Sequence, residues 1–254
     1  QFANMAGQLK KHPIRLEKIE HGLTLFIIGL GYKVIIANHL AILWRDIQGI
    51  GFESISTPLA WMGAFGYSAQ LFFDFQGYSL MAIGIGEMLG FDLPKNFDHP
   101  YRSRTVSEFY RRWHITLGRW FRDYLYIPLG GNRKGNAWTF FNLLIVWVVT
   151  GMWHGSTINF PLWGLILFVF IALERFVIRN FLEKHGWLAH LYIWFVIPLT
   201  WVVFAITKLS DLKVYFARLF PFFGTGIAVN AGDYLKYGRT YGVFFLLAFV
   251  VSLP

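Results

Sequence analysis

Long apolar segments alternate with short polar ones along most of this chain. The longest run without Asp, Glu, Lys or Arg covers 135–173, which leaves room for two membrane-spanning helices of about 20 residues each. Other uncharged runs cover 54–73 and 185–207, and 22–44 contains a single charge, Lys33. The pattern predicts five spanning helices, near 22–43, 59–80, 137–156, 160–178 and 188–207.

Composition agrees with this pattern, because 56% of the 254 residues are hydrophobic and only 15% are charged. A soluble protein would have to bury several fully apolar helices inside one modest core, which segments of this length disfavour. The sequence therefore predicts an all-α polytopic membrane protein. Cysteine is absent, which excludes disulfides, thiolate metal sites and a cysteine nucleophile.

Charge suggests how the chain is oriented. The net charge is +9, and residues 95–134 hold nine Lys or Arg against three acidic residues. Basic loops accumulate on the cytoplasmic side of membranes, so this excess does not indicate nucleic-acid binding. We expect 1–21 and 95–134 to be cytoplasmic. Because each of the five spans changes the side of the membrane, the basic segment 208–239 is then expected outside, which does not follow the rule for basic loops.

The end of the chain bears on its domain organisation. Fifteen uncharged residues follow Arg239, which is short of a full membrane span. We expect a single domain over 1–254 that is a piece of a longer protein.

The charged segment contains an amphipathic pattern. Thr105 and Glu108 have the spacing of a helix N-terminal capping box. Phe109, Trp113, Leu117, Trp120 and Tyr124 then recur at helical spacing, until Pro128 and the glycines after it end the pattern. We predict one helix over about 105–127, and an element lying in the membrane interface would explain its arginines without any ligand.

Two histidines stand out against this background. His114 lies beside the apolar stripe of the predicted helix, where a hydrogen-bonded structural role is the simplest reading. His154 lies in the uncharged run 135–173, where an ionisable side chain is a functional candidate by default. A structural hydrogen bond to a neighbouring helix is the alternative for His154.

Three stretches together carry a resemblance. They are DFQGYSLMAIGIGEMLGFDLPKNFDHPY (74–101), SEFYRRWHITLGRWFRDYLYIPLGGNRKG (107–135) and TGMWHG (150–155). They resemble the membrane-bound O-acyltransferase (MBOAT) family over about 20–210, especially its bacterial branch that O-acetylates alginate or peptidoglycan. The branch that transfers D-alanine shares parts of the pattern.

The resemblance implies a fold and two catalytic positions. The expected fold is a ring of tilted transmembrane helices with interfacial or re-entrant helices around a central funnel. Further spanning helices are expected before and after this chain. The family's near-universal histidine corresponds to His154, expected to be the general base, and its second polar position corresponds to His114, expected to orient the substrate or polarise a thioester carbonyl.

The resemblance also implies residues that bind the substrate or donor. Each of them has a structural alternative as well: an arginine can anchor the interface, and Asp74 can pair with a basic group. The expected residues are Arg111, Trp113, Arg122, Asn132, Arg133, Trp153, Asp74 and Tyr78.

The function implied is transfer of an acetyl group from cytoplasmic acetyl-CoA to hydroxyls of an extracytoplasmic polysaccharide, through a partner protein. The location implied is the bacterial cytoplasmic membrane. No bound cofactor is expected, and no metal-binding or phosphate-loop motif is present in the sequence. The alternatives are D-alanyl transfer to teichoic acid, and a non-enzymatic channel or flippase for an acyl donor or glycan.

Overall fold

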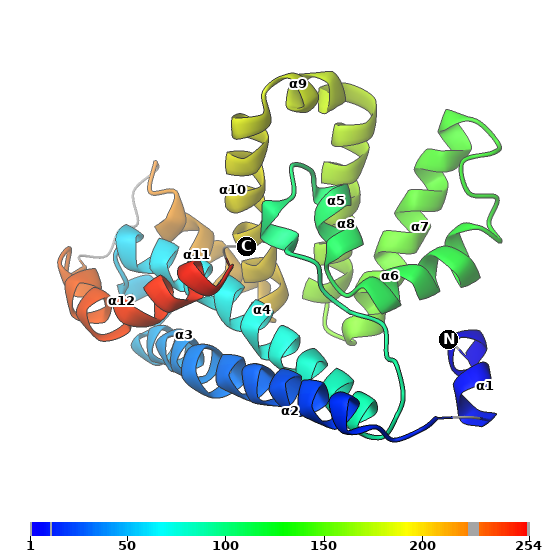
Figure 1. Cartoon of the computed structure of the whole chain (residues 1–254). Coiled ribbons are helices and arrows are strands. Elements are labelled where there is room, and N and C mark those ends of the chain that lie inside the picture. Colours follow the sequence, from blue (N-terminus) through cyan, green and yellow to red (C-terminus); the bar gives the residue numbers. More distant parts are fainter. Residues whose placement is uncertain (1, 11, 223–228, 253–254) are drawn as a thin grey trace.

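The computed structural model describes residues 2–10, 12–222 and 229–252, and every regular element within these ranges is a helix (Figure 1). This confirms the all-α prediction. The α-helices are α1 (Phe2–Lys10), α2 (Leu16–Gly31), α3 (Asn38–Ile50), α4 (Thr57–Met88), α5 (Val106–Arg112), α6 (Ile115–Phe121), α7 (Asn136–His154), α8 (Asn159–Leu173), α9 (Arg179–Lys184), α10 (Gly186–Ala205), α11 (Leu209–Leu219) and α12 (Asp233–Ser252). Three π-helical segments continue α2, α6 and α8, at Tyr32–Ala37, Arg122–Tyr126 and Glu174–Ile178, and short 3₁₀ turns lie at Phe52–Ser54 and Pro100–Arg102.

Four helical segments of the described chain are long and apolar enough to cross a membrane: Leu16–Ile50, Asn136–His154, Asn159–Lys184 and Gly186–Ala205. They confirm four of the five expected spans, and the protein is a multi-pass membrane protein. The fifth expected span, 59–80, lies within α4, whose 32 residues suffice in length. It is not among the four because Gly, Ser and Gln residues and Asp74 interrupt its apolar run.

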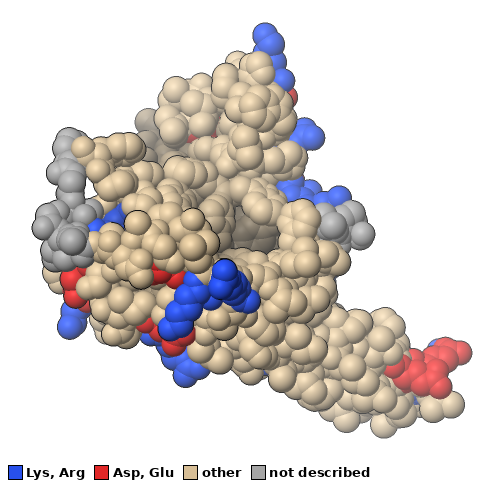
Figure 2. Space-filling model, turned by 90° about the vertical axis from the view of Figure 1, so that its left-hand side faces the viewer, with Lys and Arg blue, Asp and Glu red and all other residues tan. Residues whose placement is uncertain are grey.

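Large apolar side chains remain exposed on these helices, as expected where lipid replaces water. Val177, Trp187 and Leu191 are examples, with exposed fractions of 71%, 67% and 58%. Figure 2 shows one face of the molecule, where charged side chains gather in small groups on a largely uncharged surface.

Glycines bring α2 and α4 into close antiparallel contact (Figure 1). A Cβ atom on Gly22 would lie 2.5 Å from the carbonyl oxygen of Gly84, and one on Gly29 would lie 2.5 Å from that of Gly77. The spacing of seven residues is the same on both helices. Small residues at such positions let two membrane helices approach until their backbones touch.

The remaining long helices hold the site. α7 and α8 form a hairpin, and α9 connects the far end of α8 to α10 (Figure 1). The short helices α5 and α6 lie among these three, and α5 contacts both α8 and α10. Buried aromatic side chains fill the space between them, including Phe109 on α5, Trp163 on α8 and Trp201 on α10.

Candidate active site

His114 lies at a break between two short helices. α5 ends at Arg112, α6 begins at Ile115, and His114 has a φ of +47°, in the left-handed region. The prediction of one continuous helix over 105–127 is therefore wrong, although both halves are helical. A left-handed backbone costs about 1–2 kcal/mol for a residue with a Cβ atom, so contacts from elsewhere must hold the break.

The loop between α4 and α5 provides those contacts. The N–H of Asp98 donates to the carbonyl of Arg112 at 2.9 Å, and the N–H of Ile115 donates to the carbonyl of Asn96 at 2.9 Å. Between these two bonds the side chain of Trp113 is only 6% exposed, and its ring packs perpendicular to that of Phe97 at 5.0 Å. These tertiary bonds replace the helical ones that the sequence pattern predicts.

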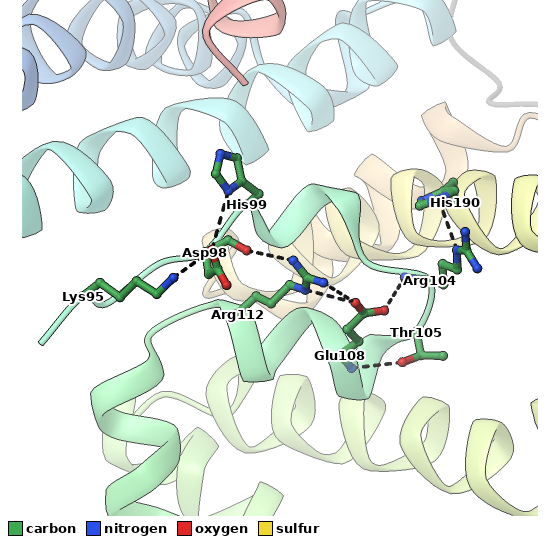
Figure 3. Close-up of polar contacts among 8 residues, drawn as sticks. All are labelled: Lys95, Asp98, His99, Arg104, Thr105, Glu108, Arg112 and His190. Carbon is green, nitrogen blue, oxygen red and sulfur yellow. Dashed lines mark hydrogen bonds and ion pairs between the residues drawn. The ribbon is translucent and has the colours of Figure 1, made fainter. Parts of the chain in front are cut away.

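Polar contacts fix the start of α5 (Figure 3). Thr105 Oγ1 accepts the N–H of Glu108 at 3.0 Å, which confirms the predicted cap. Glu108 in turn accepts the N–H of Arg104 at 2.9 Å and forms an ion pair with Arg112 at 2.8 Å. Burial alone would raise the pKa of Glu108, but the hydrogen bonds from Arg104 and Arg112 outweigh it and lower the pKa. Arg112 also donates to the carbonyl of Asp98 at 3.3 Å, so the same network ties α5 to the preceding loop.

A carboxylate from the π-helical continuation of α8 completes the N-terminus of α5. Glu174 is 4% exposed, and it accepts hydrogen bonds from the backbone N–H groups of Val106 and Ser107 and from the Ser107 hydroxyl. A buried carboxylate at a helix N-terminus satisfies N–H groups that have no partner within the helix. Glu174 therefore links α5, and with it His114, to α8.

His154 is the last residue of α7, and its imidazole packs against aromatic rings of α8 and α10. Its ring lies 5.3 Å from that of Trp163 on α8 and 5.0 Å from that of Phe204 on α10, both nearly perpendicular. Gly155 follows and turns the chain towards α8. The hairpin thus places His154 against both partner helices of α7.

One cavity of about 1320 Å³ contains both histidines. Its aromatic part includes Tyr110, Trp147, Trp163, Trp201 and Phe204. Six arginines also line it: Arg104, Arg111, Arg119, Arg122, Arg175 and Arg179. Arg122 and Arg179 pair with Asp123 and Glu183, whereas Arg111, Arg119 and Arg175 have no ion pair among the described residues. The cavity lining therefore combines several arginines with the two histidines.

The two histidines also share a neighbour. The ring of Trp153 lies 6.3 Å from that of His114 and 4.9 Å from that of His154. Burial lowers the pKa of His114 to about 4, with a smaller contribution from His154. His114 is therefore a neutral imidazole at pH 7, which can accept a proton.

The structure brings some of the other expected site residues to the cavity and not others. Arg111, Trp113 and Arg122 line it, and Trp153 contacts both histidines without being part of its wall. The remaining residues lie elsewhere. Asn132 and Arg133 are exposed in the turn before α7, Asp74 forms an ion pair with Lys33, and Tyr78 is 65% exposed.

Sequence reasoning missed three residues that shape the site: Asn96, Glu174 and Trp163. Asn96 bonds to His114 and α6, Glu174 caps α5, and Trp163 packs on His154. Glu174 offered a signal, because it is the first charge after the uncharged run 135–173. No group of three or more His, Asp or Glu residues within the described ranges is arranged to hold a metal ion.

Comparison with known proteins identifies the family. The sequence model of MBOAT, the membrane-bound O-acyltransferase family, matches residues 8–210. The chain belongs to this family. The match covers α2 to α10, and so includes His114, His154 and the whole cavity between them.

Curated MBOAT relatives carry several names. A protein of Pseudomonas fluorescens named "Probable alginate O-acetylase AlgI" is 38% identical over 87% of this chain and 45% of its own length. The "Peptidoglycan O-acetyltransferase" of Helicobacter pylori is 40% identical over 79% of this chain and 39% of its own length. The "Teichoic acid D-alanyltransferase" of Bacillus subtilis is 29% identical over 66% of this chain and 44% of its own length. The chain spans less than half of the length of these relatives.

Proposed function

We propose that this chain forms the catalytic core of a membrane O-acetyltransferase. It takes the acetyl group of cytoplasmic acetyl-CoA and delivers it to hydroxyls of an extracytoplasmic polysaccharide, by way of a partner protein. The observation that carries the proposal is the cavity, whose lining combines His114 and His154 with six arginines.

The arginines that line the cavity suit the donor. Coenzyme A carries several phosphate charges, and arginine binds phosphate through charge-assisted, often bidentate hydrogen bonds. Arg111, Arg119 and Arg175 lack ion pairs among the described residues and are therefore available to such a ligand. A volume of about 1320 Å³ exceeds that of most small-molecule pockets, as a nucleotide thioester requires.

The two histidines of the cavity suit the chemistry of acyl transfer. A base removes the proton of the acceptor hydroxyl while its oxygen attacks the thioester carbonyl, and the thiolate leaves with the proton. Histidine contributes about 10²–10⁴-fold to such steps. Aromatic rings pack around His154, and an active site that limits the access of water protects a thioester from hydrolysis.

The relatives' names guide the choice of acceptor. Those with 38% and 40% identity are named for O-acetylation of alginate and of peptidoglycan, and the relative named for D-alanyl transfer has 29% identity. An acetyl group and a polysaccharide hydroxyl are therefore favoured over D-alanine and teichoic acid. The basic segment 95–134 would face the cytoplasm, where acetyl-CoA is made, in the cytoplasmic membrane of a bacterium.

Replacing His154 tests the proposal. In membranes that contain the full-length protein and its partner, His154→Ala should abolish transfer of labelled acetyl from acetyl-CoA to polysaccharide. The control is His12→Ala, which removes an exposed histidine outside the cavity and should leave transfer intact. Undiminished transfer by His154→Ala at normal protein levels would contradict an enzyme and favour a passive conduit.

A further inference from the structure

The side chain of Asn96 joins three elements around His114. Its Oδ1 lies 3.1 Å from Nδ1 of His114, 3.2 Å from the backbone nitrogen of Thr116 and 2.9 Å from the Thr116 hydroxyl. Its Nδ2 donates to the hydroxyl of Ser79 on α4 at 3.3 Å. One amide side chain thus contacts α4, α6 and the imidazole between α5 and α6.

These contacts determine which nitrogen of His114 carries the proton. The backbone N–H of Thr116 can only donate, so the Asn96 atom that faces it must be the carbonyl oxygen. A carbonyl oxygen can only accept, so Nδ1 of His114 must be the protonated nitrogen. In a neutral imidazole the other nitrogen, Nε2, then has a free lone pair and no proton.

The remaining surroundings of His114 leave Nε2 to the cavity. The ring of Phe75 on α4 lies perpendicular to the imidazole at 4.7 Å, and Trp153 on α7 lies at 6.3 Å. The titratable group that acts on His114 is His154 of α7, whereas α4 and the loop present the uncharged Phe75 and Asn96. His114 lines the cavity, and the nitrogen not bound to Asn96 is the one available there.

We propose that Asn96 is a positioning residue that holds His114 as its Nδ1–H tautomer, so that Nε2 of His114 accepts the proton of the acceptor hydroxyl. This inference rests on the proposed acetyl transfer. In this proposal His114 is the residue that accepts the proton, whereas the family resemblance led us to expect His154 in that role.

The reaction step balances as follows. The hydroxyl O–H bond breaks and its proton passes to Nε2 of His114, while the oxygen forms a bond to the thioester carbonyl carbon. The carbon–sulfur bond then breaks, and the thiolate of coenzyme A takes the proton back from Nε2. A neutral His114 with its proton on Nε2 could not begin this sequence.

The first test measures the tautomer directly. Nitrogen NMR of the full-length protein labelled in histidine, with His114 assigned by loss of its signal in His114→Gln, should show a protonated Nδ1 and an unprotonated Nε2 at neutral pH. A protonated Nε2 would overturn the inference. Because this measurement needs no substrate, it stands apart from failure of the proposed function, which would appear as absent acetyl transfer by the unmodified protein.

The second test uses matched variants in the acetyl-transfer assay. Asn96→Ala should lower kcat by about 10- to 100-fold, as loss of a partner that orients an imidazole does elsewhere. Asn96→Asp keeps the accepting oxygen but adds a negative charge, and should move the acid limb of the pH–rate profile upwards by about one unit or more. His12→Ala changes an exposed histidine outside the cavity, and should leave both kcat and the profile unchanged.

Discussion

Gly164 on α8 packs directly against the backbone carbonyl of Trp147 on α7. A Cβ atom at Gly164 would overlap that oxygen, and one at Gly151 on α7 would overlap the carbonyl of Phe160 in the same way. The backbones of the two helices are therefore in direct contact, at a glycine of α7 and at a glycine of α8. Their separation fixes how far His154 stands from Trp163, because the two residues belong to the two helices.

Gly164→Ala should therefore separate α7 from α8 and displace His154. Overpacking of this kind typically costs about 1–3 kcal/mol. Thermal unfolding of the purified full-length protein should show a lower midpoint, together with reduced acetyl transfer. The matched control is Gly242→Ala in α12, where a Cβ atom would meet nothing within 4 Å. An unfolding midpoint no lower for Gly164→Ala than for Gly242→Ala would contradict the backbone contact.

Asp74 should matter for stability more than for turnover, because it forms an ion pair with Lys33 and does not line the cavity. Asp74→Asn leaves Lys33 without its counter-charge and should lower the free energy of unfolding by about 1–3 kcal/mol. The double variant Asp74→Asn, Lys33→Met should recover part of that loss. A fall in turnover per folded molecule, with unchanged stability, would instead return Asp74 to the active site.

Arg111 and Arg119 should contribute to donor affinity. Arg111→Gln and Arg119→Gln should each raise the KM for acetyl-CoA by about 2- to 5-fold, the size expected for an exposed ion pair, with little change in kcat. KM should also rise with ionic strength, because salt screens such contacts. Arg133→Gln changes an exposed arginine outside the cavity and serves as the control. Equal effects of all three replacements would indicate general attraction to the membrane surface.

The pH dependence of transfer should report His114. Because burial, with a smaller effect of His154, lowers its pKa to about 4, the imidazole stays neutral well below its ordinary pKa of 6.5. As the pH falls, transfer should therefore persist through pH 6 and fall only near pH 4, where Nε2 becomes protonated. The rate should be measured in open membrane fragments, with recovery at pH 7 as the control. An acid limb near pH 6.5 would mean that His114 is solvated or does not take part.

The spanning helices of the hairpin could be predicted from the sequence to within a few residues. α7 and α8 were expected near 137–156 and 160–178 and lie at Asn136–His154 and Asn159–Leu173, with π-helical residues continuing α8. The length of an uncharged run identifies a spanning helix, and that length can be read directly from the sequence. α4 was harder to classify, because it packs through glycines against α2 and needs fewer apolar residues than a lipid-facing span.

The break at His114 could not be predicted in this way. The apolar spacing from Phe109 to Tyr124 is that of one helix, and only hydrogen bonds from Asn96 and Asp98 interrupt it. Those bonds link residues from different segments, and periodicity within one segment carries no information about them. The roles of Asn96 and Glu174 could not be predicted for the same reason, because they depend on hydrogen bonds to distant segments.

Among the expected site residues, those close to His114 in the chain line the cavity, and those further along the same motif do not. Arg111, Trp113 and Arg122 flank the histidine within one segment and line the cavity with it. Asn132 and Arg133 belong to the same family motif but lie in an exposed turn beyond a π-helical segment. Proximity along the chain indicated the cavity wall only as far as α6 and its π-helical continuation extend.

The shortness of α5 and α6 has a consequence for protein engineering. Each has seven residues, well below the length at which an isolated helix is stable in water. The segment YRRWHITLGRW would therefore not keep its shape if it were transplanted into another membrane scaffold. A working graft would have to include Ser79, Asn96 and Glu174 as well, because hydrogen bonds from these three distant residues hold α5, α6 and the turn at His114.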